Sequence, residues 1–425
     1  MIEKIHMMGI GGSGMSAVAL LASKMGYSVT GCDLEDSTAY SKNIFKGHNP
    51  EHLEGADLLV VTPAVYYQNS KNPELVEGQK RKMVMTWQEF LGEYLQKNKK
   101  VICVAGTHGK STTTAMAGKL LIDAGFDPLV VVGANVPEWN GNARYGKGEY
   151  FIIEADEFNN NFLNYSPEII VLNNIEFDHP DFFKSESDVF ESFKRFIGRL
   201  TGMKILIANE DSEGVNKLLK TVDKSDLKIV GCSARVDKLD FDLAIPGKHN
   251  VSNALGVVAL GKLLGIQGDV IKKSLSAFSG IGRRMELIAD KDGVKVYDDY
   301  AHHPTAIAAT LQGLRELYPS ARIWAIDEPH GFARTKALLN LYKNVFADAD
   351  KVLIGPIFKA RDKETFGITP QIVAQKTHHP DAKGYDSFDE IKKILGKGVE
   401  KGDVVLVMGA GKSYLWAREI ANLIK

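Results

Sequence analysis

A short turn of glycine, hydroxyl and cationic residues follows an apolar run at residues 101–105. It reads Gly-Thr-His-Gly-Lys-Ser at positions 106–111, and a helical pattern continues from it. Glycine lets consecutive backbone N–H groups turn toward an anion, and the positive end of the following helix attracts the same anion. Lys110 could bind the β and γ phosphates of a nucleotide, and the Ser111 hydroxyl could bind Mg²⁺. The pattern predicts a phosphate-binding loop for ATP, with an ordinary turn that opens a helix as the alternative. The residues expected to bind the nucleotide are Gly106, Thr107, His108, Gly109, Lys110, Ser111 and Thr112.

A second glycine-rich turn lies near the N-terminus. It carries a G-x-G-x-x-G pattern after an apolar run, and an aspartate follows about twenty residues later. This spacing is typical of a dinucleotide-type fold, in which the glycines let a pyrophosphate approach the helix N-terminus. The pattern does not distinguish NAD, FAD and a nucleotide sugar, and a tight turn without a ligand is the alternative. The residues expected at this substrate site are Gly9, Gly11, Gly12, Gly14, Met15 and Asp33.

Acidic and imidazole side chains end two later apolar runs, at residues 154–157 and 173–179. Ligands in open α/β sheets bind at the carboxyl ends of strands. A carboxylate and an imidazole there could hold Mg²⁺ near the phosphates, since Mg²⁺ prefers oxygen ligands but tolerates one histidine among them. A solvated loop or a helix cap is the alternative.

Further polar groups follow in the second half of the chain. His249, Asn250 and Asn253 lie where a helix is expected to begin, so their amides could cap that helix or contact an adenine. Arg283 and Arg284 are expected between the second and third units, and charged residues at 298–303 and 327–334 are expected at strand ends. These groups could close over the phosphate-binding loop or form salt bridges between domains. The sequence Gly-Ala-Gly-Lys-Ser at 409–413 imitates a phosphate loop, and we interpret it as a turn that opens a helix.

Apolar runs and helical patterns alternate along the whole chain, which predicts parallel sheets with crossover helices. Several runs are almost entirely Ile, Val and Leu, as in strands buried on both faces. We expect three consecutive α/β units, at residues 1–98, 99–280 and 281–425. The expected strands are residues 3–10, 27–33, 56–63, 101–106, 150–156, 168–175, 204–209, 294–300, 321–327, 351–357 and 403–411, and the expected helices include 16–26, 252–265, 305–318 and 336–347.

The composition restricts the class of protein. The 425 residues carry a formal net charge of −1, so no basic field favours nucleic acid or an anionic membrane surface. No apolar run reaches the roughly 18–20 residues of a membrane span, and the N-terminus has no signal-peptide pattern. The cysteines Cys32, Cys103 and Cys232 lie far apart, which suggests neither a disulfide framework nor a zinc site. We interpret them as reduced core thiols of a cytoplasmic protein.

The motifs, taken in order, resemble the Mur ligases over essentially the whole chain. Those motifs are GIGGSGM, AGTHGKSTTT, EADE, NIEFDH, HNVSNA, GIGRR and DDYAHHPT. The resemblance implies a three-domain α/β enzyme with a Rossmann-like N-terminal domain for a UDP-sugar, a central P-loop ATPase-type domain with a parallel sheet, and a Rossmann-like C-terminal domain that closes over the site. It also implies ATP- and Mg²⁺-dependent amide formation through an acyl phosphate. Within the family the likeness is to the branch that joins L-alanine to UDP-N-acetylmuramate.

The resemblance also assigns roles to individual residues. It implies catalytic roles for Lys110, His179, Arg284, His302 and Arg334. It places Mg²⁺ at Ser111, Glu154 and His179, and ATP at His249, Asn250, Asn253, Arg284 and Asp299, in addition to the loop. It places the incoming amino acid at His302, His330 and Arg334.

Some departures from the family pattern leave alternatives open. Gly331 stands where the alanine-adding branch commonly has arginine, which puts the acceptor in doubt. The nearest alternative is the branch that joins UDP-N-acetylmuramate to a murein tripeptide, but the sequence Glu-Pro-His at 328–330 favours the alanine branch. A nicotinamide-dependent oxidoreductase is a more distant alternative, which the loop at Lys110 disfavours. Lys194 has the spacing of a carbamylated lysine in other Mur ligases, but carbamylation is not expected in this branch. The state expected is a monomer or a homodimer.

Overall fold

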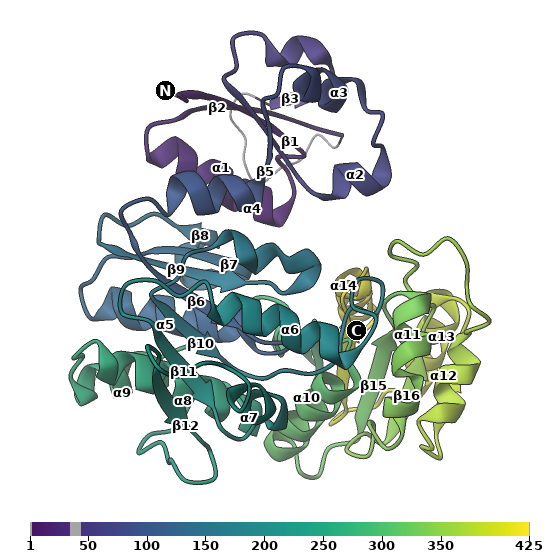
Figure 1. The fold of residues 1–425 in the computed structure, drawn as a ribbon. Coiled ribbons are helices and arrows are strands. Elements are labelled where there is room, and N and C mark those ends of the chain that lie inside the picture. Colours follow the sequence, from purple (N-terminus) through teal and green to yellow (C-terminus); the bar gives the residue numbers. More distant parts are fainter. Residues whose placement is uncertain (1, 35–43, 425) are drawn as a thin grey trace.

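The computed structural model describes residues 2–34 and 44–424 and contains three β-sheets in chain order (Figure 1). The first is a five-stranded parallel sheet, ordered β3 (Ile44–Lys46), β2 (Ser28–Asp33), β1 (Lys4–Met8), β4 (Leu58–Val61) and β5 (Val84–Thr86). Its helical segments are α1 (Ser13–Lys24), η1 (Pro50–Leu53), α2 (Ala64–Gln68), α3 (Pro73–Lys80), α4 (Trp87–Phe90) and η2 (Leu91–Leu95).

The second sheet has seven strands, and only its edge strand β8 is antiparallel. The order is β12 (Lys228–Cys232), β11 (Ile205–Asn209), β10 (Ile169–Leu172), β6 (Lys100–Ala105), β9 (Tyr150–Ala155), β7 (Leu129–Val136) and β8 (Gly141–Arg144). The helical segments around it are α5 (Lys110–Asp123), η3 (Pro137–Trp139), η4 (Phe158–Asn164), α6 (Glu186–Ile197), α7 (Glu213–Leu219), α8 (Lys248–Leu263) and α9 (Gly268–Ser276).

The third sheet has six strands, and its edge strand β13 is antiparallel. The order is β13 (Glu286–Lys291), β14 (Val294–Asp299), β18 (Val404–Gly409), β15 (Ile323–Glu328), β16 (Lys351–Ile354) and β17 (Ala382–Gly384). The helical segments are α10 (Pro304–Leu317), α11 (Phe332–Leu338), η5 (Leu339–Tyr342), α12 (Pro370–Lys376), α13 (Phe388–Gly398) and α14 (Ser413–Leu423). The bounds predicted for the helix at 336–347 are therefore wrong. The helical segment begins at Phe332 as α11, continues as the tighter helix η5 from Leu339 and ends at Tyr342.

The expected fold class is confirmed, because three α/β sheets follow one another along the chain. The exact boundaries proposed between units stay predictions. The central strands are apolar because helices cover both faces of each sheet; β10 and β4, for example, are buried at every position. One apolar cluster runs from α1 and Phe90 of the first unit to Phe162 and Tyr165 of the second, so these two units share a continuous core.

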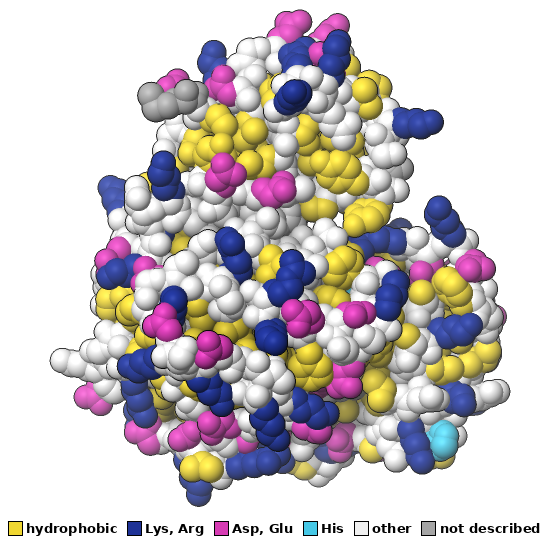
Figure 2. Space-filling model, viewed as in Figure 1, with side chains coloured by type: hydrophobic (Ala, Val, Ile, Leu, Met, Phe, Trp, Pro, Cys, Tyr) yellow, Lys and Arg dark blue, Asp and Glu magenta, His cyan; other side chains and the backbone are white. Residues whose placement is uncertain are grey.

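The third unit meets the second through polar contacts and through the close approach of α10 to α8. Cys32, Cys103 and Cys232 are buried free thiols, as expected. Lysine and arginine side chains are interspersed with aspartate and glutamate over the face shown in Figure 2, in keeping with the small net charge. No helix in the described part of the chain combines the length and apolarity needed to cross a membrane.

Candidate active site

The predicted phosphate-binding loop joins β6 to α5 at the carboxyl edge of the second sheet. Gly106 and Gly109 have φ angles of 140° and 79°, in the region that favours glycine. A Cβ atom on Gly109 would lie 2.4 Å from Oδ1 of Asn253. Asn174 fixes the other side of the loop, because its side-chain oxygen accepts a hydrogen bond from the His108 N–H at 2.7 Å. The loop conformation is therefore set by the end of β10 and the start of α8.

The first amides of α5 are open to a ligand. The N–H groups of Gly109, Lys110, Ser111 and Thr112 have no hydrogen-bond partner within residues 2–34 and 44–424. Unpaired N–H groups at a helix N-terminus attract an anion. The geometry of residues 106–112 therefore fits the phosphate group that the sequence predicts.

The Lys110 ammonium bridges the loop and a buried carboxylate. It donates hydrogen bonds to the carbonyl oxygen of Gly106 at 2.7 Å and to Oε2 of Glu157 at 2.8 Å. Burial would lower the pKa of Lys110, but the carboxylates of Glu157 and Asp156 outweigh it and raise that pKa above its usual value. Lys110 therefore carries a positive charge beside the open amides.

Three side chains near Lys110 could hold a metal ion. One ligand atom from each of Asp156, Glu157 and His179 lies within 4.8 Å of the others. Oε1 of Glu157 is buried without a hydrogen-bond partner among the described residues, and Nε2 of His179 lies 3.8 Å from it. Two carboxylates and one imidazole suit a hard divalent cation such as Mg²⁺. The residues present therefore fit the metal that the family resemblance implies.

The predicted metal ligand Glu154 lies outside this cluster. Its Oε2 accepts a hydrogen bond from the N–H of Gly133 at 2.6 Å. The sequence motif contains both glutamates, and only the strand end decides which one faces Lys110: Glu154 is still within β9, whereas Glu157 follows the end of the strand. The sequence predicted a possible Mg²⁺ carboxylate within residues 154–157 but singled out Glu154 rather than Asp156 or Glu157. The metal-binding roles of Ser111 and Glu154 stay predictions.

An ion pair joins the second unit to the third beside this cluster. Arg334 of α11 donates to both carboxylate oxygens of Asp178, at 2.6 and 2.9 Å, and to the carbonyl oxygen of His302 at 2.9 Å. Burial opposes ionisation of Asp178, but the guanidinium outweighs it and holds the pKa of Asp178 well below its usual value. The sequence predicted Arg334 but missed Asp178, which precedes His179 directly.

A second contact between the units involves the loop itself. Nε2 of His108 lies 3.4 Å from Glu176, and Thr305 at the start of α10 donates to the same carboxylate at 2.7 Å. The His108 and His303 rings are 4.7 Å apart. The start of α10 therefore lies over the phosphate-binding loop, with Glu176 as the group that both units contact.

His302 and His330 face each other beside Arg334, with ring centres 5.6 Å apart. Nδ1 of His302 lies 2.8 Å from the carbonyl oxygen of Tyr300, which places the ring proton on Nδ1 and leaves Nε2 as an acceptor. Burial, with Arg334 nearby, lowers the pKa of His302 well below its usual value and that of His330 to about 4. Both imidazoles are therefore neutral near pH 7.

Within the part of the chain that the structure describes, the two asparagines predicted to lie beside adenine form hydrogen bonds near the start of α8. Asn250 donates to the carbonyl oxygen of Pro246 at 2.7 Å, and Asn253 donates to Oδ1 of Asn250 at 3.3 Å. Nδ1 of the half-buried His249 is buried and unpartnered among the described residues, and loss of solvation lowers the pKa of this imidazole. The two asparagine contacts tie the start of α8 to the preceding residues without capping the helix, and a direct contact with adenine stays a prediction.

The two arginines before the third sheet have different surroundings. Arg283 donates to Asp298 at 3.2 Å and to the carbonyl oxygen of Gly409 at 2.8 Å, so it holds this sheet together. The predicted Arg284 has its guanidinium over the Tyr300 ring, 5.1 Å from the ring centre. Asp299 accepts from the backbone N–H groups of Met285 and Ala301, so its carboxylate already orders the backbone here. The ATP-binding roles of Arg284 and Asp299 stay predictions.

The N-terminal glycine turn lies between the first two units. Oδ2 of Asp33 accepts a hydrogen bond from the Gly11 N–H at 2.8 Å, and a Cβ atom on Gly14 would lie 2.8 Å from the Trp87 ring. The Asn142 side chain of β8 donates to the carbonyl oxygen of Ser13. The turn is thus ordered from both units. The substrate contacts of all six predicted residues stay predictions: Gly9, Gly11, Gly12, Gly14, Met15 and Asp33.

The look-alike turn at residues 409–413 opens α14, as the sequence predicts. The carboxylate of Glu328 accepts hydrogen bonds from the N–H groups of Lys412 at 3.1 Å and Ser413 at 3.0 Å. An internal carboxylate therefore occupies the place that a phosphate would take.

Comparison with known proteins identifies the class of enzyme. Three sequence models match in chain order: "Mur ligase family, catalytic domain" at residues 4–99, "Mur ligase middle domain" at 104–261 and "Mur ligase, glutamate ligase domain" at 283–411. The chain therefore belongs to the Mur ligase family, and the resemblance seen in its motifs is confirmed.

Individual relatives place it more closely within the family. The UDP-N-acetylmuramate–L-alanine ligase of Caldicellulosiruptor bescii is 35% identical over 96% of each chain. The crystal structure of the UDP-N-acetylmuramate–alanine ligase of Thermotoga maritima is 26% identical, with a TM-score of 0.78 over 99% of this chain and 98% of that one. A murein peptide ligase from Psychrobacter arcticus is also 26% identical, with a TM-score of 0.70 over the same shares.

Proposed function

We propose that this chain is an ATP-dependent ligase that joins L-alanine to the lactyl carboxylate of UDP-N-acetylmuramate, a step in the synthesis of peptidoglycan precursors. The observation that carries the proposal is the open row of amides at Gly109–Thr112, with Lys110 and Glu157 beside it. Arg334 of the third unit binds the carbonyl oxygen of His302 and also Asp178, which is next in sequence to the metal-cluster residue His179. The family membership and the curated alanine-adding relatives support it. Because the proposed reaction consumes ATP and UDP-N-acetylmuramate and releases ADP, the enzyme is expected in the cytoplasm.

The proposed reaction has two steps. The lactyl carboxylate attacks the γ-phosphorus of ATP, ADP leaves, and an acyl phosphate forms. The amine of alanine then attacks the acyl carbon, and phosphate leaves from a tetrahedral intermediate. The open amides would hold the phosphate oxygens, and Lys110 would exchange its contacts with Gly106 and Glu157 for a phosphate oxygen.

Mg²⁺ would bind at the cluster of Asp156, Glu157 and His179, with the Ser111 hydroxyl as a further predicted ligand. Bound there, the ion would offset negative charge on the phosphate groups. Release of Lys110 from Glu157 would leave that carboxylate available to the ion, so ATP and Mg²⁺ are expected to bind together.

The amine acceptor would bind where Arg334, His302 and His330 meet. The guanidinium is held by Asp178 and could also attract the carboxylate of an amino acid. Nε2 of His302 could accept a hydrogen bond from the amine, but its low pKa makes it a weak base. We therefore assign it to orientation of the acceptor. Gly331, with a φ of 78°, directly precedes α11 beside this group and leaves the acceptor side without the arginine of the usual pattern.

The nucleotide sugar would bind at the first glycine turn, where Asp33 orders the backbone around Gly11. The turn contacts β8 of the second unit through Ser13, so a sugar bound there would extend toward the second unit.

The decisive experiment measures phosphate release by the purified chain with ATP, Mg²⁺ and UDP-N-acetylmuramate. We expect release only when an acceptor is added, and we expect L-alanine to exceed L-serine, glycine and the murein tripeptide in kcat/KM. Mass spectrometry of the product identifies the acceptor. A preference for the tripeptide would assign the recycling reaction instead. If none of the four acceptors supports turnover, both ligase assignments are contradicted.

A further inference from the structure

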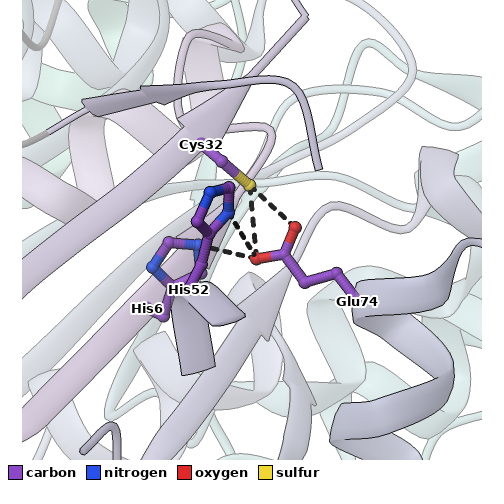
Figure 3. A group of neighbouring side chains, drawn as sticks. All are labelled: His6, Cys32, His52 and Glu74. Carbon is purple, nitrogen blue, oxygen red and sulfur yellow. Dashed lines mark hydrogen bonds and ion pairs between the residues drawn. The ribbon is translucent and has the colours of Figure 1, made fainter. Parts of the chain in front are cut away.

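Four side chains that could bind a metal converge on one face of the first sheet (Figure 3). His6 comes from β1, Cys32 from β2, His52 from η1 and Glu74 from the first turn of α3. This face is covered by η1 and α3, and its apolar cluster includes Leu53 and Leu75, the neighbours of His52 and Glu74. None of these residues belongs to the proposed ligase site.

The donor atoms are as close together as the ligands of one ion. One donor atom from each of the four residues lies within 4.8 Å of the others. Oε1 of Glu74 is 2.8 Å from Nε2 of His6 and 3.4 Å from Nδ1 of His52, and Sγ of Cys32 is 3.2 Å from Oε2. Ligands around tetrahedral zinc, with bonds of about 2.0–2.3 Å, are separated by about 3.3–3.7 Å. The 2.8 Å between His6 and Glu74 and the 3.2 Å between Cys32 and Glu74 are shorter, so these atoms would move apart by a few tenths of an ångström to admit the ion. The side chains of His6, Cys32 and Glu74 are completely buried.

His6 is oriented so that one ring nitrogen faces Thr30 and the other faces Glu74. Its Nδ1 lies 2.8 Å from Oγ1 of Thr30, and that hydroxyl donates to the carbonyl oxygen of Ile5. The Thr30 hydroxyl therefore accepts a hydrogen bond from the Nδ1–H, which leaves a lone pair on Nε2 when the imidazole is neutral. Nε2 lies 2.8 Å from Oε1 of Glu74, so the two groups form an ion pair when the imidazole carries both protons and face each other as two acceptors when it is neutral. A cation between the two groups would satisfy both.

His52 offers a second imidazole donor that faces Glu74. Its Nδ1 is buried 3.4 Å from Glu74 without a hydrogen-bond partner in the described part of the chain. The ring stacks on Phe45 with centres 4.4 Å apart, which fixes its plane. His48 offers a fifth donor, because its Nδ1 lies 3.2 Å from Sγ of Cys32 and 3.4 Å from Glu74.

We propose that His6, Cys32, His52 and Glu74 form a structural zinc site, with His48 beside it. A thiolate, two imidazoles and one carboxylate are ligand types that zinc binds in tetrahedral geometry. The four protein ligands would close the coordination shell, which distinguishes this site from a catalytic one. Cys32 would bind as the thiolate after loss of its proton.

The site would connect the outer elements of the first unit to its sheet. An ion would tie η1 and α3 to β1 and β2, and the carbonyl oxygen of Cys32 accepts hydrogen bonds from the N–H groups of Gly9 and Ile10 in the glycine turn. A surface hollow of about 410 Å³, lined in part by Thr30, Phe45 and His52, offers a path for the ion. Zinc is therefore expected to stabilise the unit that carries the glycine turn.

The test uses the full-length chain, freed of metal with a chelator and then titrated with zinc alone. We expect one zinc ion per chain by elemental analysis and a higher melting temperature than that of the metal-free protein. Cobalt(II) in place of zinc should give visible bands of tetrahedral coordination and a near-ultraviolet thiolate-to-metal band. A chain that binds neither ion, or binds cobalt without the thiolate band, would overturn the proposal.

Two variants separate a metal site from a hydrogen-bonded network around Glu74. Cys32→Ser keeps a hydrogen-bond donor but removes the thiolate, so the thiolate-to-cobalt band should disappear. Cys232→Ser, which alters a buried thiol on β12, is the matched control and should keep the band. Thr30→Val removes the group that orients His6 and should weaken zinc binding about 10–100-fold. Full zinc affinity and an intact band in Cys32→Ser would contradict the assignment.

Discussion

The turns at residues 106–111 and 409–413 have similar sequences and opposite environments. Each follows a central strand, contains Gly-Lys-Ser or Gly-Ala-Gly-Lys-Ser, and opens a helix with a buried serine. In the first turn the amides at Gly109–Ser111 have no partner among the described residues, and a carboxylate pairs with the lysine. In the second, Glu328 accepts from the amides of Lys412 and Ser413.

The comparison shows that a glycine-rich turn is a phosphate site only where the surrounding fold leaves its amides open. Arg283 completes the second turn by donating to the Ser413 hydroxyl at 3.0 Å and to the carbonyl oxygen of Gly409. The second turn is therefore occupied by Glu328 and Arg283, which belong to its own unit, and these contacts hold the third sheet together. The first turn has an acidic cluster beside it and another unit above it, which is the arrangement that a phosphate-transfer reaction needs.

The largest effect is expected from Lys110→Ala. Loss of the ammonium that faces the open amides should lower kcat for ADP release about 10³-fold, while binding of UDP-N-acetylmuramate persists. The matched control is Lys412→Ala, which removes the exposed lysine of the second turn and should leave turnover near wild type. Steady-state kinetics and calorimetric titration measure both, and an equal loss in the two variants would show that the turns do not differ as proposed.

A second large effect concerns the unit that covers the first turn. Asp178→Ala would leave the Arg334 guanidinium buried without its carboxylate, and breaking such a buried pair costs about 3–5 kcal/mol. We expect a lower melting temperature and a higher KM for the amino acid, because Arg334 also holds the carbonyl oxygen of His302. A double-mutant cycle with Arg334→Ala isolates the pair, and additive effects of the two changes would contradict this coupling.

The second turn can be opened by Glu328→Ala. Removal of this carboxylate leaves the amides of Lys412 and Ser413 unpartnered, at a cost of about 1–3 kcal/mol in the free energy of unfolding. If the Glu328 carboxylate alone keeps anions out of the second turn, sulfate should raise the melting temperature of this variant more than that of the wild type. An equal response to sulfate would mean that the second turn cannot bind an anion even when it is open.

The last effect is a pH dependence that arises where the start of α10 lies over the first turn. Burial lowers the pKa of His303 to about 4, and its Nδ1 accepts a hydrogen bond from Thr305 at the start of α10. Between about pH 4 and 6.5 the unfolded chain binds a proton that the folded chain does not, so the free energy of unfolding falls as the pH falls, by at most about 1.4 kcal/mol per unit.

His303→Asn tests this dependence because asparagine keeps a helix-capping acceptor but does not titrate. The variant should show a shallower decline of the melting temperature between pH 6.5 and 4 than the wild type. The same slope in both proteins would assign the decline to other groups.

The interior of each sheet could be predicted from sequence, but the edges could not. The predicted strands correspond to β1, β2, β4, β6, β9, β10, β11, β14, β15, β16 and β18, all of which lie inside their sheets. The edge strands β3, β5, β8, β12, β13 and β17 were all missed, because they are short or half-exposed and lack a continuous apolar run. The interior strand β7 was also missed, although its first four residues are apolar and buried.

The sequence by itself determined the order of the units, the two glycine turns and the kind of chemistry, because glycine, lysine and hydroxyl residues at fixed spacing act within one turn. Only the tertiary structure decided which carboxylate faces Lys110, that Asp178 holds Arg334, and that Glu328 fills the second turn. It also brought together His6, Cys32, His52 and Glu74, which are separated by twenty or more residues at each step. Such contacts depend on strand ends and sheet faces that meet only in the folded chain, and local spacing carries no record of them.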